Sequence, residues 1–146
     1  MSNILAEKWS VTKPVVQSSG GVVTSQHYLA SEVGARVLAQ GGNAMDAAVA
    51  TSFALGVVEP WMSGLGGCAF MVTYSAADDK TYVLESGVRA PLAVDPADYP
   101  LSTGFDSDLF NWPGVVDNRN VMGPWSVAVP GLVAGLDAVV ERFATW

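Results

Sequence analysis

Cysteine and histidine are almost absent from this sequence of 146 residues, which contains one of each, Cys68 and His27. A single cysteine excludes an intrachain disulfide. One cysteine and one histidine also fall short of the ligand set of a usual structural zinc site. We therefore expect no structural metal and no bound cofactor.

Basic residues are scarce and scattered. Seven Lys and Arg stand against 14 Asp and Glu, which gives a formal net charge of −7. A nucleic-acid surface needs clustered cations. We therefore expect small molecules or other proteins as partners, and no nucleic acid.

Long apolar runs are missing as well. The longest apolar stretch, residues 44–58, is about 15 residues long, whereas a membrane-spanning helix needs roughly 20 apolar residues. This stretch predicts a buried helix and no membrane span. The first ten residues contain no cationic segment followed by an apolar run of the kind found in secretory signals, so we expect a cytoplasmic protein.

Apolar residues themselves are plentiful. They make up 50% of the chain, and charged residues make up only 14%. This composition is typical of a folded chain, and the length fits one domain. A high apolar content without a membrane span also predicts that much of the chain is buried against more protein than these residues supply.

The spacing of apolar and turn residues predicts a mixed α/β (α+β) architecture. Leu29, Val33 and Val37 recur at helical spacing, and Gly41 with Gly42 ends that helix. Asn43 is a candidate N-cap for a second, alanine-rich helix, with Asp46 near the positive end of its dipole. The predicted order is an arm at 1–20, a strand at 21–25, helices at 28–40 and 43–57, a hairpin formed by 69–74 and 81–85, a long loop at 102–120, a strand at 126–129 and a helix from 132 to 143.

Three features have a chemical and a structural interpretation. The glycine loop at residues 64–67 could bind an anion, but it precedes a strand and lacks the Gly-Lys-Ser/Thr pattern, so close backbone packing beside the sheet is favoured. His27 with Ser25 makes a weak nucleophile–base pair, because no third orienting group is indicated. Cys68 has apolar neighbours and is expected to be a small core residue.

Charged residues give one further candidate. The carboxylates Glu59, Glu85, Asp95 and Asp98 are expected to be helix caps or solvated loop charges. Arg89 differs because it lies in a bend just after a predicted strand, where side chains are often presented to a cleft. A guanidinium can hold a carboxylate through two hydrogen bonds. Arg89 is therefore our candidate for binding a substrate carboxylate.

Several segments, taken in order, resemble the N-terminal part of the gamma-glutamyltransferase (glutathione hydrolase) family. The resemblance runs from about residue 14 to residue 144. The matching stretches are Gly21-Val22-Val23, Leu29-Ala30-Ser31-Glu32, Gly41-Gly42-Asn43-Ala44-Met45-Asp46-Ala47-Ala48-Val49-Ala50, Leu55-Gly56-Val57-Val58-Glu59-Pro60, Ser63-Gly64-Leu65-Gly66-Gly67, Phe70-Met71, Ala90-Pro91 and Val129-Pro130-Gly131. Their combination is specific, although no single piece is.

The resemblance implies a four-layer αββα sandwich of the N-terminal-nucleophile hydrolases. Residues 21–146 would then be the N-terminal portion of a large subunit, an incomplete domain that follows the arm at 1–20. The family precursor cuts itself in two, and its small subunit begins with a threonine whose hydroxyl attacks an amide while its own α-amine acts as base.

The family's cleavage motif, two threonines followed by a histidine, is absent from this sequence. We therefore expect no catalytic residue in this chain and no activity from the chain alone. The expected partners are the remainder of the large subunit and a small-subunit chain that carries the N-terminal threonine.

The resemblance also bears on the substrate, which would be a small amide. The family's glutamate-binding arginine lies four residues before the proline equivalent to Pro91, and Gly87 occupies that position here. If the strand continues, Gly87 and Arg89 share a face, and Arg89 takes over the binding of the carboxylate. The nearby wall would be shaped by three glycines, Gly64, Gly66 and Gly67. Two alternatives stay open: a related non-glutamyl amidase or acylase subunit, and a truncated, non-catalytic scaffold or interaction protein.

Overall fold

The computed structural model describes residues 15–106 and 110–146, and it has the mixed architecture expected from the sequence. The main elements are α1 (Tyr28–Ala39), α2 (Ala44–Val58), α3 (Pro60–Ser63), β1 (Ala69–Ser75), β2 (Lys80–Ser86), β3 (Leu101–Phe105), β4 (Pro113–Val115) and α4 (Leu132–Phe143). Short 3-10 turns lie at Pro96–Asp98, Val116–Asn118 and Pro124–Ser126. The first 14 residues of the predicted arm lie outside the described residues.

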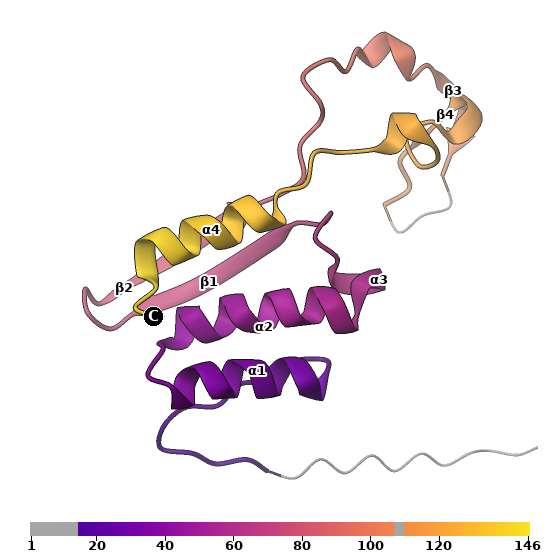
Figure 1. The fold of residues 1–146 in the computed structure, drawn as a ribbon. Coiled ribbons are helices and arrows are strands. Elements are labelled where there is room, and N and C mark those ends of the chain that lie inside the picture. The colour runs from indigo at the N-terminus through magenta and orange to yellow at the C-terminus, as the bar shows by residue number, and fades with distance from the viewer. Residues whose placement is uncertain (1–14, 107–109) are drawn as a thin grey trace, which may run out of the picture.

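Both predicted helices are formed, and α1 and α2 lie side by side (Figure 1). The connection between them turns at Gly41, whose positive φ of 95° suits glycine. Gly34 of α1 faces Thr51 of α2 and leaves no room for a Cβ atom there. The two helices can therefore approach closely, and the alanine-rich α2 is buried on this side as well as on the side of α4.

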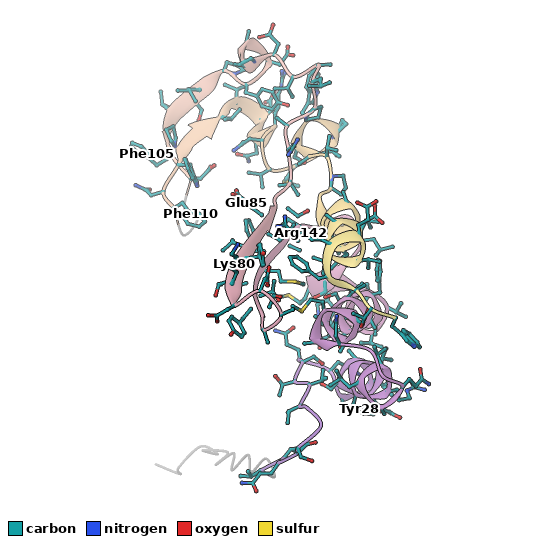
Figure 2. All side chains as sticks on the ribbon, turned by 90° about the vertical axis from the view of Figure 1, so that its left-hand side faces the viewer. Tyr28, Lys80, Glu85, Phe105, Phe110 and Arg142 are labelled. Atoms are coloured by element: carbon teal, nitrogen blue, oxygen red, sulfur yellow. The ribbon has the colours of Figure 1, made fainter. Side chains whose placement is uncertain are left out.

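The core lies between α2, α4 and one face of the β1–β2 hairpin. Its fully buried centre comes from α4, where Leu136 and Val139 are each 1% exposed. Met71 of β1 and Leu84 of β2 pack against this cluster from the hairpin. Figure 2 shows the helices gathered on one side of the hairpin. The hairpin itself was predicted correctly, with Ala69 opposite Ser86 at its open end.

The other face of the hairpin is uncovered in the described residues. Its side chains alternate with those of the core face, and Phe70, Val72 and Val83 are 68%, 75% and 73% exposed. All three are large apolar side chains. In the described residues, β1 and β2 pair only with each other, so the outer edge of each strand is also unpaired. The predicted burial against additional protein therefore concerns this face first.

The segment between residues 90 and 128 leaves the body and returns to it (Figure 1). Its two ends meet at Arg89 and Val129, which exchange backbone hydrogen bonds of 3.0 and 2.8 Å. The long loop predicted at 102–120 was wrong in part, because Leu101 and Phe105 of β3 pair with Val115 and Pro113 of β4. Of that loop, residues 107–109 lie outside the described residues.

Two predicted strands are not formed. Residues 21–25 have no strand partner in the described part of the chain, although Val23 is half-buried and packs near Gly34 of α1. Residues 126–129 begin at the last residue of the 3-10 turn Pro124–Ser126 and contribute only the bridge between Val129 and Arg89. β-Branched composition favours an extended backbone, but a strand also requires a neighbouring strand for its ladder.

Candidate functional site

The predicted site residues gather at the open end of the hairpin, where β1 begins and β2 ends. The glycine loop at 64–67 leads into β1, and Gly87 and Arg89 follow β2. The N-terminus of α4 lies at the same place, because the carbonyl oxygen of Gly67 accepts hydrogen bonds from the N–H groups of Gly131 and Leu132, both at 3.1 Å. The N–H groups at the start of a helix lack intrahelical partners. Gly67 therefore supplies a partner for the first turn of α4.

A second bond joins β2 to the same point. The hydroxyl of Ser86 donates to the carbonyl oxygen of Gly131. The glycine loop, the end of β2 and the start of α4 are thus connected by hydrogen bonds at Gly67, Gly131 and Ser86. We call this connection the Gly67–Gly131 junction.

On one side of the Gly67–Gly131 junction lies a cavity of about 580 Å³. Helices α2, α3 and α4 and the glycine loop form its walls. Its lining contains no charged side chain and comprises Ser52, Leu55, Pro60, Trp61, Met62, Ser63, Gly64, Gly66, Gly67, Cys68, Ala69 and Leu132. Trp61 and Met62 are largely exposed. We call it the glycine-loop cavity.

On the other side lies a cavity of about 420 Å³, which we call the Arg89 cavity. Arg89 and Gly87 both line it, together with Glu85 and the small side chains of α4 at Ala134 and Ala138. The strand does not continue through Gly87 and Arg89, as the prediction of a shared strand face required. β2 ends at Ser86, and Arg89 lies outside it in a bridge to Val129. The two residues nevertheless face one cavity.

The three predicted glycines differ in what they do. A Cβ atom on Gly64 would lie 2.8 Å from the carbonyl oxygen of Pro60, so this position admits only glycine without a backbone shift. A Cβ atom on Gly66 would meet nothing. Gly67 closes a turn through its N–H, which donates to Gly64 at 3.0 Å, and it bonds α4 through its carbonyl group. All three line the glycine-loop cavity, whereas Arg89 lines the neighbouring one.

Other candidates from the sequence have structural roles or different surroundings. His27 is the N-cap of α1, and its Nδ1 accepts from the N–H of Leu29 at 3.2 Å. The Ser25 hydroxyl donates to the carbonyl oxygen of His27 at 2.8 Å, away from the ring nitrogens. Cys68 was predicted to be a core residue, which is wrong in the described chain: it is exposed and lines the glycine-loop cavity.

Sequence reasoning missed two parts of this site. One is helix α3, which brings Trp61 and Met62 to the glycine-loop cavity. Pro60 is a signal for it, because proline is favoured at the first position of a helix. The other is Ser86, whose hydroxyl bonds Gly131; no pattern in the sequence distinguishes it from other serines at a strand end.

Several groups with shifted pKa values lie at the opposite end of the hairpin. The hydroxyl of Tyr74 donates to Asp79 at 2.7 Å, and this bond raises the pKa of Tyr74. Hydrogen bonds from Ser75 and then Tyr82 lower the pKa of the Asp78 carboxyl. These interactions belong to the hairpin turn and not to either cavity.

No group of three or more His, Cys, Asp or Glu residues in ranges 15–106 and 110–146 is arranged to hold a metal ion. In the same ranges, no helix is both long enough and apolar enough to cross a membrane.

Comparison with known proteins gives a consistent result. The family model of gamma-glutamyltranspeptidase matches residues 30–146. The glutathione hydrolase proenzyme of Bacillus subtilis (strain 168) is 39% identical over 136 residues, which cover 91% of this chain and 21% of that protein. The acylase ACY 1 proenzyme of Pseudomonas sp. (strain SE83) is 38% identical over 135 residues, covering 91% of this chain and 23% of the relative.

The fold agrees with solved structures of the same kind. Helicobacter pylori gamma-glutamyltranspeptidase superposes with a TM-score of 0.73 and 35% identity, covering 91% of this chain and 35% of that chain. This chain spans about a fifth of the length of the curated relatives it matches. Its helices and hairpin are part of the N-terminal-nucleophile hydrolase sandwich, and the chain belongs to the gamma-glutamyltranspeptidase family.

Proposed function

We propose that this chain is a large-subunit segment of a gamma-glutamyltransferase-like amide hydrolase or transferase, whose nucleophilic threonine comes from another chain or another part of the protein. The observation that carries the proposal is the Arg89 cavity, in which Gly87 and Arg89 meet beside the glycine loop. Gly87 occupies the position of the family's glutamate-binding arginine. Arg89 brings a guanidinium to the same cavity.

The chemistry divides between the two parts of the protein. The threonine hydroxyl attacks the amide carbonyl carbon while its α-amine takes the hydroxyl proton. The α-ammonium then returns this proton to the amide nitrogen, the C–N bond breaks, and the amine leaves behind an acyl-enzyme. Water or an acceptor amine then releases the acyl group. This chain binds and orients the substrate, because Arg89 holds a substrate carboxylate with two charge-assisted hydrogen bonds. Fixing the substrate in this way places its amide against the nucleophile.

The uncovered face of the hairpin supports the need for a partner. Phe70, Val72 and Val83 expose large apolar surfaces, and each such side chain gains roughly 1.5 to 3 kcal/mol when it becomes fully buried. A second sheet packed on this face would complete the two central layers of the αββα sandwich. The remainder of the large subunit and the small subunit are the proposed source of that sheet.

A second candidate is an acylase that acts on a non-glutamyl amide. The glycine-loop cavity favours it, because no charged side chain lines that cavity and because Leu55, Trp61 and Met62 give it apolar walls. An uncharged acyl group would fit such walls, whereas a free carboxylate would lose hydration without gaining a cation. The relative named acylase ACY 1 supports this candidate as well.

The two candidates differ in their dependence on Arg89. In the full-length protein, Arg89→Ala should raise the KM for a gamma-glutamyl anilide by roughly tenfold to a hundredfold, because hydrogen bonds to charged groups contribute about 1.5 to 3 kcal/mol. It should leave the hydrolysis of an uncharged N-acyl anilide unchanged. Arg36→Ala, which removes an exposed arginine of α1, is the matched control and should alter neither.

Three outcomes discriminate. If only the N-acyl anilide is cleaved, the acylase candidate replaces the glutamyl one. If Arg89→Ala and the wild type cleave the glutamyl anilide equally well, the carboxylate role of Arg89 is wrong. If intact-mass analysis of the purified protein finds no chain that begins with threonine and neither substrate is cleaved, the enzymatic proposal fails and a scaffold role is left.

A further inference from the structure

The start of α2 is held by two side chains that serve each other. The Oδ1 atom of Asn43 accepts hydrogen bonds from the N–H groups of Met45 and Asp46 at 2.8 and 3.0 Å. In return, the Oδ2 atom of Asp46 accepts from the N–H of Asn43 at 2.8 Å. This reciprocal pair is a capping box, which satisfies N–H groups that a helix start leaves unpaired. Its function up to this point is local.

The same two side chains also hold the far end of α4. The side-chain amide of Asn43 donates to the carbonyl oxygen of Phe143, the last residue of α4, at 2.6 Å. Oδ2 of Asp46 accepts from both the N–H and the hydroxyl of Thr145, at 3.2 and 3.1 Å. One pair of residues thus starts one helix and fixes the end of another, about 100 positions later in the chain. We call this set of bonds the Asp46 clasp.

Burial makes the Asp46 clasp selective. Asp46 is only 8% exposed, so little water can replace a lost donor. Bonds to a carboxylate are stronger than bonds between neutral groups, and a buried carboxylate that loses its donors is costly. The carboxylate therefore favours the one arrangement in which the segment after α4 lies against the start of α2.

The opposite end of α4 is the Gly67–Gly131 junction. Helix α4 has 12 residues, which at the rise of an α-helix corresponds to about 18 Å between its two ends. Helix α2 runs from the Asp46 clasp to α3 and the glycine loop, so both helices connect the same two places (Figure 1). A rigid helix held at one end fixes the position of the other. A shift of α4 along its axis would move Gly131 and Leu132 away from the carbonyl oxygen of Gly67.

We propose that Asp46 is a positioning residue for the substrate end of the hairpin: by holding the end of α4 it keeps the Gly67–Gly131 junction closed and fixes the wall between the two cavities. Asp46 lines neither cavity, and acts through α4. The mechanical part of the inference depends on the described contacts alone. Only its kinetic consequence rests on the proposed amide hydrolase function.

The mechanical part is tested by hydrogen exchange on the full-length protein. Asp46→Asn should accelerate exchange at the amides of Gly131 and Leu132 by about tenfold, in line with the loss of bonds to a charged group. Thr145→Val leaves the capping box intact and should accelerate the same amides by a few fold. Thr145→Ser retains the hydroxyl and should leave them unchanged.

A loss of overall stability would give a different pattern. Ala30→Gly weakens α1 at a fully buried position in its first turn and is the control for general destabilisation. In this control the exchange rates of the β1 amides and of the Gly131 and Leu132 amides should rise by the same factor. If Asp46→Asn or Thr145→Val also changes all of them equally, the positioning role is wrong.

Kinetics provide the second readout. A distorted wall should raise the KM for the preferred anilide several fold in Asp46→Asn and Thr145→Val, with kcat per active site within about twofold of the wild type. A proportional fall in activity at unchanged KM, as in a less folded enzyme, would overturn the inference. If the protein cleaves no anilide at all, the proposed function fails, and the exchange experiment still decides whether Asp46 controls the Gly67–Gly131 junction.

Discussion

The two faces of the β1–β2 hairpin are built from similar residues but have different surroundings. On the core face, Met71 and Leu84 pack against α4 and α2. On the opposite face, Val72 and Val83 are 75% and 73% exposed. An antiparallel hairpin with one solvated face usually alternates apolar and polar residues, whereas a strand buried on both faces is apolar throughout. The middle of the hairpin, at 70–72 and 83–84, is apolar on both faces and therefore favours burial on both sides, of which the described chain provides one.

The largest expected effect concerns the covered face. Leu136→Ala should lower the free energy of unfolding by about 2 to 5 kcal/mol, because it leaves a cavity in the centre of the core where Leu136 is 1% exposed. Urea denaturation of the full-length protein, followed by tryptophan fluorescence, measures the change. A loss below about 1 kcal/mol would mean that the core face collapses around the gap and is less tightly packed than its burial indicates.

The next effect tests whether the outer face is covered in the full-length protein. Val83→Ala should lower the free energy of unfolding by roughly 1 to 2 kcal/mol if a second sheet covers Val83. A change within about 0.5 kcal/mol, which is usual for surface positions, would show that this face remains open to solvent. Lys80→Ala, at an exposed position near the turn of the same hairpin, is the control for changes that do not depend on burial.

The difference between the body and the segment at 90–128 explains what the sequence predicts well. Helix α1 follows the apolar periodicity of its sequence, and α2 follows its N-cap signal, because Asn43 and Asp46 form a capping box at its start. The strands β3 and β4 were missed because they are short, contain Pro113 and carry no alternating pattern. The local sequence pattern thus predicts long helices and strands, but it fails for short strand pairs whose formation depends on the surrounding loop.

The candidate site shows the same limit. The sequence placed Arg89 after a strand and the glycines in a loop, which the structure agrees with. It gave no indication that Gly67 separates the glycine-loop cavity from the Arg89 cavity, because that arrangement depends on a bond to Gly131, which lies 64 positions later in the numbering. The exposure of Cys68 could not be predicted from the sequence either, since apolar neighbours along the chain do not determine which side chains pack against Cys68 in the fold.

The smallest expected effect concerns the bonds that hold α4 on the core face. Burial raises the pKa of Asp46, but hydrogen bonds from the N–H groups of Asn43, Thr145 and Trp146 and from the Thr145 hydroxyl outweigh it, and the pKa lies below its ordinary value of 3.8. A carboxyl whose pKa is lower in the folded state stabilises the fold above its unfolded pKa, and this contribution is lost as the pH falls through the folded pKa. At pH 7, Asp46→Asn should therefore reduce the free energy of unfolding by about 1 kcal/mol, the usual cost of losing a helix cap.

Unfolding measured at acid pH tests whether the charge of Asp46 stabilises the fold, and it compares this core-face contribution with the outer face of the hairpin. The difference in unfolding free energy between the wild type and Asp46→Asn should be constant from pH 7 to pH 5 and should shrink below about pH 4, where Asp46 takes up a proton in the unfolded chain before it does so in the folded one. Because Asp78 also has a lowered pKa and is present in both proteins, the subtraction removes its contribution. A difference that does not change down to pH 3 would mean that the charge of Asp46 contributes nothing, and that its shape alone holds α4 against the hairpin. The same titration on Val83→Ala should run parallel to the wild type, since no carboxylate of the Asp46 clasp faces the outer side of the hairpin.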